Sequence, residues 1–169
     1  MRRTTPRLPH CRKETDLGRV CLTIDSKLDE LFIISVLIRG ICDHLHTNAT
    51  QKYSLELCAV EAVTNVIKHA YRGIAGHQVS LDISYSPDRI DLQVCDEGIS
   101  MPQEQIDRLA NGSPVFDFDP QCLLSVPEGG MGLALMRHEM DEISYSAQNG
   151  GNRLVLTKFI HPGAAAGRI

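Results

Sequence analysis

Apolar residues recur along this chain with two different spacings. They alternate with polar residues over positions 20–24, 79–85 and 90–94, which is the period of a strand that buries one face. Over positions 31–45 and 53–70 they recur three and four residues apart without any proline, as is typical of amphipathic helices. The first half of the chain therefore predicts a strand, two long helices and an antiparallel hairpin.

The sequence also predicts where the first of the two helices begins and which side of each helix faces the core. The sequence Ser26-Lys27-Leu28-Asp29 resembles a capping box, so we expect the first helix to begin there. Its core side is expected to carry Leu31, Ser35, Ile38, Ile41 and Leu45. The apolar face of the second helix is expected to consist of Leu55, Ala59, Ala62, Val63 and Val66.

The second half of the chain contains shorter elements. Helices are expected over 102–109 and 132–140, whereas residues 113–127 have no period and predict a long loop, of a kind that often serves as a lid. Strands are expected over 143–146 and 153–160. This order indicates an α+β two-layer sandwich, in which helices cover one face of a mixed, mostly antiparallel sheet.

The two ends of the chain differ in composition from the part between them. Residues 1–17 hold five basic and two acidic side chains without an apolar period, which predicts a flexible basic arm. Residues 162–169 are mostly glycine and alanine and predict a disordered tail. The folded domain is therefore expected over residues 18–161.

Charge and composition exclude several classes of function. The net charge of −4 does not offer the basic surface that binds nucleic acid. The longest apolar run, residues 31–38, is far shorter than the roughly 20 residues that span a bilayer. Six cysteines without close Cys or His pairs predict reduced, mostly buried thiols instead of zinc ligands. We therefore expect a cytoplasmic protein that binds neither nucleic acid nor membrane.

The second predicted helix carries a polar stripe that a core helix does not need. Glu61, Asn65 and His69 are spaced four residues apart, and Lys68 follows Glu61 by seven, so all four project from one side. A carboxylate, an amide and two groups that can carry positive charge thus converge. The pattern also fits the solvated face of an ordinary amphipathic helix.

Two further segments could contact a ligand. In Asp96-Glu97-Gly98 the carboxylate can accept hydrogen bonds from a ligand amine and the glycine lets a planar group approach, although such triplets also form plain turns. Gly129-Gly130-Met131-Gly132-Leu133 precedes a helix, whose free N–H groups and dipole favour an anion. The same glycines could instead serve as a hinge for the preceding loop.

In this order, the stripe, the Asp-x-Gly turn, the long loop and the glycine-rich helix start resemble the Bergerat ATP-binding fold of gyrase, Hsp90, sensor histidine kinases and MutL. The run Glu61-Ala62-Val63-Thr64-Asn65-Val66-Ile67-Lys68-His69-Ala70-Tyr71 and the later Met140-Asp141-Glu142-Ile143 look most like bacterial anti-sigma-factor serine/threonine kinases. The resemblance extends over residues 18–160.

The resemblance implies a role for each residue of the stripe. Asn65 would be a ligand of Mg²⁺, since a hard cation that bridges triphosphate oxygens suits a neutral amide oxygen. Glu61 would be the general base that takes a proton from an attacking hydroxyl. Lys68 or His69 would add a positive contact.

The resemblance also implies how ATP would be held. Asp96 would accept a hydrogen bond from the adenine amino group, with Gly98 beneath the ring. Ile99-Ser100 follows Gly98 here, where the wider superfamily often has a second glycine. The phosphates would be covered by the lid and by the glycine-rich segment, through Gly130, Met131, Gly132 and Leu133.

The function implied by the resemblance is an ATP-dependent protein serine/threonine kinase. It would phosphorylate an anti-sigma-factor antagonist and sequester a sigma factor, and a homodimer is the usual form of the family. Two alternatives remain open at this point: a nucleotide-responsive binding module without significant kinase activity, and a switch kinase that controls a phosphatase. Glu61 favours a kinase, because a pure binding module does not need that carboxylate.

Overall fold

The computed structural model describes residues 18–111, 131–148 and 150–160. Their strands form one five-stranded sheet in the order β1-β2-β3-β5-β4, and every neighbouring pair is antiparallel. The strands are β1 (Gly18–Asp25), β2 (Gln78–Ser86), β3 (Arg89–Asp96), β4 (Glu142–Gln148) and β5 (Gly151–Phe159). The predicted arm over 1–17, loop over 113–127, tail over 162–169 and Gly130 lie outside the described residues.

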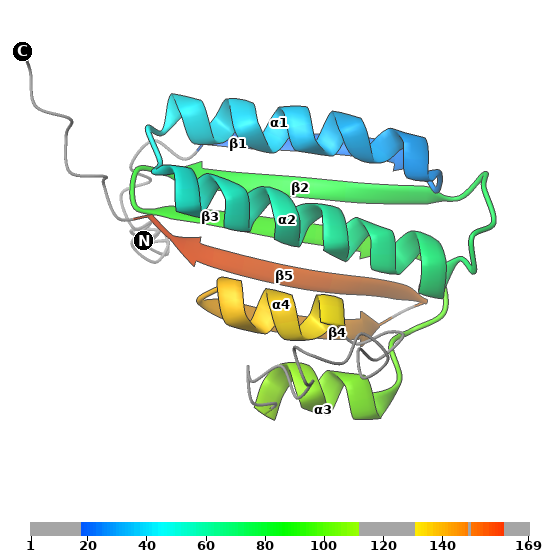
Figure 1. Ribbon diagram of the computed structural model, residues 1–169. Helices are drawn as coiled ribbons and strands as arrows, with labels where there is room; N and C mark the ends of the chain where they lie inside the picture. The colour runs from blue at the N-terminus through cyan, green and yellow to red at the C-terminus, as the bar shows by residue number, and fades with distance from the viewer. Residues whose placement is uncertain (1–17, 112–130, 149, 161–169) are drawn as a thin grey trace, which may run out of the picture.

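The helices lie mainly on one face of this sheet (Figure 1), which confirms the predicted α+β two-layer sandwich. Helices α1, α2 and α4 run across that face, and α3 lies beyond the β4 edge (Figure 1). Their bounds are α1 (Leu31–His44), α2 (Ala49–Asn65), α3 (Gln103–Asn111) and α4 (Met131–Glu139), with a 3₁₀ turn η1 (Leu28–Glu30) before α1 and a π-helical turn η2 (Val66–Ala70) after α2. No helix in the described part of the chain is long and apolar enough to cross a membrane.

The core lies between the sheet and the helices, and the strand period places its residues. Alternate residues of β2 and β3 point at α1 and α2, so that Leu81, Ile83 and Leu92 are almost completely buried. Helix α2 meets them with the predicted face, because the four expected core residues in α2 and the fifth, Val66 at the start of η2, are all buried. Two of these, Ala59 and Ala62, are small and allow a close approach of the helix to the sheet.

The structure corrects three local predictions about the first two helices, in whole or in part. The Ser26 hydroxyl does not cap a helix; it donates to the Ile74 carbonyl at 2.7 Å, and so ties the end of β1 to the segment before β2. Helix α1 buries Ile34 and Cys42 beside the predicted Ile38 and Ile41, while the predicted Leu31 and Leu45 pack against the core only partly buried. Ser35, also predicted for the core side, is half-buried. Helix α2 begins four residues earlier than predicted, because the Asn48 side chain accepts the Gln51 N–H at 2.8 Å.

The prediction of mostly buried thiols holds for two of the four described cysteines. Cys42 and Cys58 are buried, whereas Cys95 is half-buried and Cys21 is exposed. All four are free thiols. Burial raises the pKa of Cys58 to about 12, so this thiol is unreactive in the folded protein.

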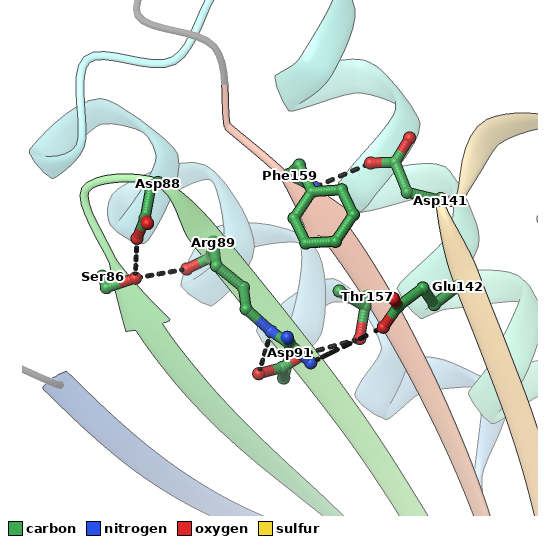
Figure 2. A network of polar contacts seen from close by, with 8 residues as sticks. All are labelled: Ser86, Asp88, Arg89, Asp91, Asp141, Glu142, Thr157 and Phe159. Carbon is green, nitrogen blue, oxygen red and sulfur yellow. Dashed lines mark hydrogen bonds and ion pairs between the residues drawn. The ribbon is translucent and has the colours of Figure 1, made fainter. Parts of the chain in front are cut away.

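A polar network ties the far ends of three strands together on the face of the sheet turned away from α2 (Figure 2). Arg89 donates to both oxygens of Asp91 at 2.9 and 2.8 Å, and the Thr157 hydroxyl donates to the same carboxylate at 2.5 Å. The Arg89 guanidinium also lies 5.8 Å from the centre of the Phe159 ring. The network links β3 to β4 and β5 at this end of the sheet. Asp96 lies at the opposite end of β3, so the network takes no part in the site described below.

Candidate functional site

Glu61 and Asn65 of α2 face the beginning of α4. A Cβ atom built on Gly132 would lie 2.5 Å from Glu61 Oε2 and 3.5 Å from Asn65 Nδ2. The first distance is too short for a real contact, so any side chain at this position would displace the Glu61 carboxylate. The structure thus brings together three residues that the sequence predicted as parts of one site.

The other two residues of the predicted stripe lie on a different kind of turn. Lys68 and His69 belong to η2, where the Tyr71 N–H donates to the Val66 carbonyl at 2.9 Å, five residues earlier. A π-helical turn is wider than an α-helical one, so side chains four apart no longer stack directly above one another. Both side chains are exposed, and the described residues provide neither with a hydrogen bond or ion pair.

Several contacts hold α4 in place against α2. The buried Ser54 hydroxyl donates to the Glu139 carboxylate, and Lys158 of β5 donates to the Glu139 carbonyl at 2.6 Å. The Ser54 hydroxyl lowers the pKa of Glu139. Met136 is fully buried, and Leu133 is partly buried against the core. The position of Gly132 beside Glu61 is therefore fixed by contacts at both ends of α4, while the neighbouring Met131 is 38% exposed.

The Asp-x-Gly turn at the end of β3 packs on the end of η2. A Cβ on Gly98 would lie 2.7 Å from the Ala70 carbonyl oxygen, and the Ile99 N–H donates to that same oxygen at 3.0 Å. A side chain at position 98 would therefore clash with the backbone of η2, so the fold itself requires glycine there. Asp96 is 9% exposed, and its Oδ1 accepts the Gly98 N–H at 2.8 Å.

Three residues that sequence reasoning missed support this turn. Tyr71 accepts the Glu97 N–H at 2.9 Å and donates to the Gln78 carbonyl at 2.8 Å. Asn152 lies directly opposite Asp96 in the β3–β5 ladder and is bonded in turn to Tyr145. A signal for Asn152 exists only once the register of β3 and β5 is known, because these strands are not consecutive in the chain.

The two parts of the site lie along one helical axis. Glu61 lies in α2, and Ala70, whose carbonyl oxygen accepts the Ile99 N–H, lies nine residues later at the end of η2. A cavity of about 1180 Å³ opens at the end of the sheet beside Asp96, and its lining includes Tyr71, His77 and Asn152. Glu61 and Asn65 do not line it, so this cavity belongs to the Asp96 end alone.

Residues 26–158 match the model of the histidine kinase-like ATPase domain. The fold and the site therefore define the class: the chain belongs to the histidine kinase-like ATPase domain family, as its motifs predicted. Several relatives of this chain are named as serine kinases. It is 32% identical over 117 residues to the serine/threonine-protein kinase BtrW of Bordetella bronchiseptica, covering 68% of this chain and 75% of BtrW.

One further relative agrees with this assignment, and two solved structures share the fold. The chain is 30% identical over 144 residues to the serine-protein kinase RsbW of Bacillus pumilus, covering 83% of this chain and 85% of RsbW. The solved structure of the RsbU and RsbW domains of Rv1364c from Mycobacterium tuberculosis superposes with a TM-score of 0.57 at 14% identity, over 86% of this chain and 34% of that one. The SiaB–SiaC complex from Pseudomonas aeruginosa gives a TM-score of 0.59 at 13% identity, over 83% of this chain and 88% of the matched chain. These superpositions confirm the fold.

Proposed function

We propose that this protein is a serine/threonine kinase that transfers the γ-phosphoryl group of MgATP to a hydroxyl of a small partner protein. The observation that carries the proposal is the contact of Gly132 with Glu61 and Asn65. It places a carboxylate and an amide at the N-terminal end of α4, where free N–H groups and the helix dipole favour phosphate. The relatives named as serine kinases support the same chemistry.

The residues at α2 and α4 fit a magnesium ion held together with a triphosphate. Asn65 would hold the ion through its amide oxygen, and the absence of a side chain at Gly132 lets the start of α4 lie close to Asn65 and Glu61. Bound Mg²⁺ would neutralise charge on the phosphate oxygens. Among the described residues, no group of three or more His, Cys, Asp or Glu side chains forms an alternative metal site.

Glu61 would act as the general base. The substrate hydroxyl oxygen forms a bond to the γ-phosphorus while the bond from that phosphorus to the bridging oxygen breaks, ADP leaves, and the hydroxyl proton passes to the Glu61 carboxylate. At the other end of the site, Asp96 would accept from the adenine amino group. Gly130, Met131, Leu133, Lys68 and His69 remain predicted contacts for the phosphates.

For partners, we propose an anti-sigma-factor antagonist as the phosphorylated protein and a sigma factor as the sequestered one. A homodimer and a cytoplasmic location are proposed with them. The relatives named RsbW support this choice, and the SiaB–SiaC structure shows a similar fold in complex with another protein.

The test uses calorimetry followed by mass spectrometry. Wild type should bind ATP more tightly with Mg²⁺ than without it, and Asn65→Ala should lose this difference. Glu61→Gln should bind nucleotide normally but leave no phosphoserine on the antagonist encoded by the same host. Glu56→Gln is the matched control, because Glu56 lies on the same helix and pairs with Arg39 at the surface.

The possible results separate the candidate functions. Nucleotide binding without phosphoserine formation by wild type would favour the binding module, and absence of nucleotide binding would refute the site itself. Phosphorylation by Glu61→Gln at the wild-type rate would refute the role of Glu61 as base.

A further inference from the structure

A chain of hydrogen bonds leads from the segment before α3 to Asp96. The Met101 N–H donates to the Tyr145 oxygen at 2.8 Å, and the Tyr145 hydroxyl donates to Asn152 Oδ1 at 2.9 Å. Asn152 Nδ2 then donates to Asp96 Oδ1 at 2.8 Å. Asn152 is 5% exposed, so water does not compete freely for these bonds.

The chemistry of the partners fixes the direction of every bond in this relay. Asn152 Nδ2 lies within reach of two acceptors, Asp96 Oδ1 and the Gly98 carbonyl at 3.0 Å, so this atom is the amide nitrogen. The Tyr145 oxygen already accepts from Met101, so its own hydrogen goes to Asn152 Oδ1. Both hydrogens and the oxygen of the Asn152 amide therefore form hydrogen bonds with protein groups, so Asn152 acts as a positioning residue.

The relay leaves one oxygen of Asp96 for a ligand. Asp96 Oδ1 receives two donors, the Gly98 N–H and Asn152 Nδ2, each at 2.8 Å. Asp96 Oδ2 receives none from residues 18–111, 131–148 or 150–160, although the residue is only 9% exposed. Asp96 Oδ2 is therefore the carboxylate oxygen that remains free to accept a hydrogen bond from a ligand in the adjoining cavity.

We propose that Tyr145 and Asn152 position Asp96 so that the site prefers a 6-amino purine over a 6-oxo purine. The inference rests on the proposed function, in which Asp96 contacts the base. An exocyclic amino group donates to Asp96 Oδ2, whereas a 6-oxo group would place its lone pairs against the same oxygen. Rotation of the carboxylate could relieve that clash, and the relay opposes this rotation by holding Oδ1.

Tyr145→Phe interrupts the relay without touching the nucleotide. The Asn152 oxygen then loses its donor, so the amide is held through its nitrogen alone and positions Asp96 Oδ1 less firmly. We expect the affinity for ADP to fall about tenfold, the size of a lost hydrogen bond to a charged group, while inosine diphosphate changes by less than about threefold. The matched control is Tyr85→Phe, because the described residues offer no hydrogen-bond partner to the Tyr85 hydroxyl.

The experiment is calorimetric titration of wild type and both variants with ADP and with inosine diphosphate, accompanied by thermal unfolding. A fall of the ADP preference in Tyr145→Phe alone supports the relay. An unchanged preference in folded Tyr145→Phe overturns the relay while leaving the kinase proposal intact, and failure of wild type to bind ADP overturns both. If Tyr145→Phe does not fold, Asn152→Ser cuts the relay one step later and should show the same loss of preference; an unchanged preference there overturns the relay.

Discussion

Gly132→Ala should separate the stability of this protein from its activity. The new Cβ would lie 2.5 Å from Glu61 Oε2, and an ordinary contact begins at 3.4 Å, so the carboxylate has to recede by about 0.9 Å. The atom that the new Cβ meets is the far end of the flexible, half-buried Glu61 side chain, so rotation of that side chain relieves the clash at little cost to folding. Replacing a helical glycine by alanine meanwhile stabilises a helix by up to about 1 kcal/mol.

The displaced carboxylate should be costly for catalysis. A shift of about 1 Å in a reacting group can lower a rate about 100-fold, so we expect phosphorylation of the partner protein to fall by that factor. The affinity for ADP should fall much less than the rate of phosphorylation, because the Asp96 end of the site is untouched. Thermal unfolding, ADP titration and a phosphoserine time course measure the three quantities on one preparation.

Gly40→Ala is the control for the helix effect alone. Gly40 lies in α1, and a Cβ there would meet nothing within 4 Å. This variant should gain similar stability and keep full activity. A folded Gly132→Ala variant with wild-type turnover would refute the role given to Glu61, and a variant that melts well below wild type would show that Glu61 does not absorb the clash.

Three other measurements test the fold around the site. Ser54→Ala should lower the free energy of unfolding by about 1 kcal/mol at pH 7. Because the Ser54 hydroxyl holds the pKa of Glu139 below its ordinary 4.5, this difference should be complete above that pH and disappear as the pH falls through the folded-state pKa, which urea unfolding across pH will show. Asn48→Ala should cost about 1 kcal/mol by removing the cap of α2, and an unchanged urea midpoint would contradict the cap. Cys58, with a pKa of about 12, should resist iodoacetamide in the folded state and react after unfolding, whereas its labelling in native protein at the rate of exposed Cys21 would argue against its burial.

The sequence by itself determined the elements whose signals are local. Alternation of apolar residues predicted β2 and β3, and the helical spacing from Leu55 to Val66 predicted the buried face of α2. These patterns are reliable because a strand or helix must bury its apolar side whatever it packs against. The order of the polar stripe, the Asp-x-Gly turn and the glycine-rich helix start sufficed to predict the family.

The tertiary structure decided which groups meet. Ser26 has the chemistry of a helix cap, but its hydroxyl finds the Ile74 carbonyl instead, since a hydroxyl binds whichever partner the fold brings within reach. The π-helical turn at Lys68 and His69 likewise leaves no trace in the apolar period.

The same distinction holds inside the site. The sequence named Glu61, Asn65 and Gly132, but only the packing of α4 on α2 puts the glycine against the carboxylate. Asn152 reaches Asp96 through the register of two strands that are distant in the chain. Local periodicity determines what each segment becomes, whereas contacts between distant segments depend on the packing of the whole core, and no single stretch of sequence encodes that packing.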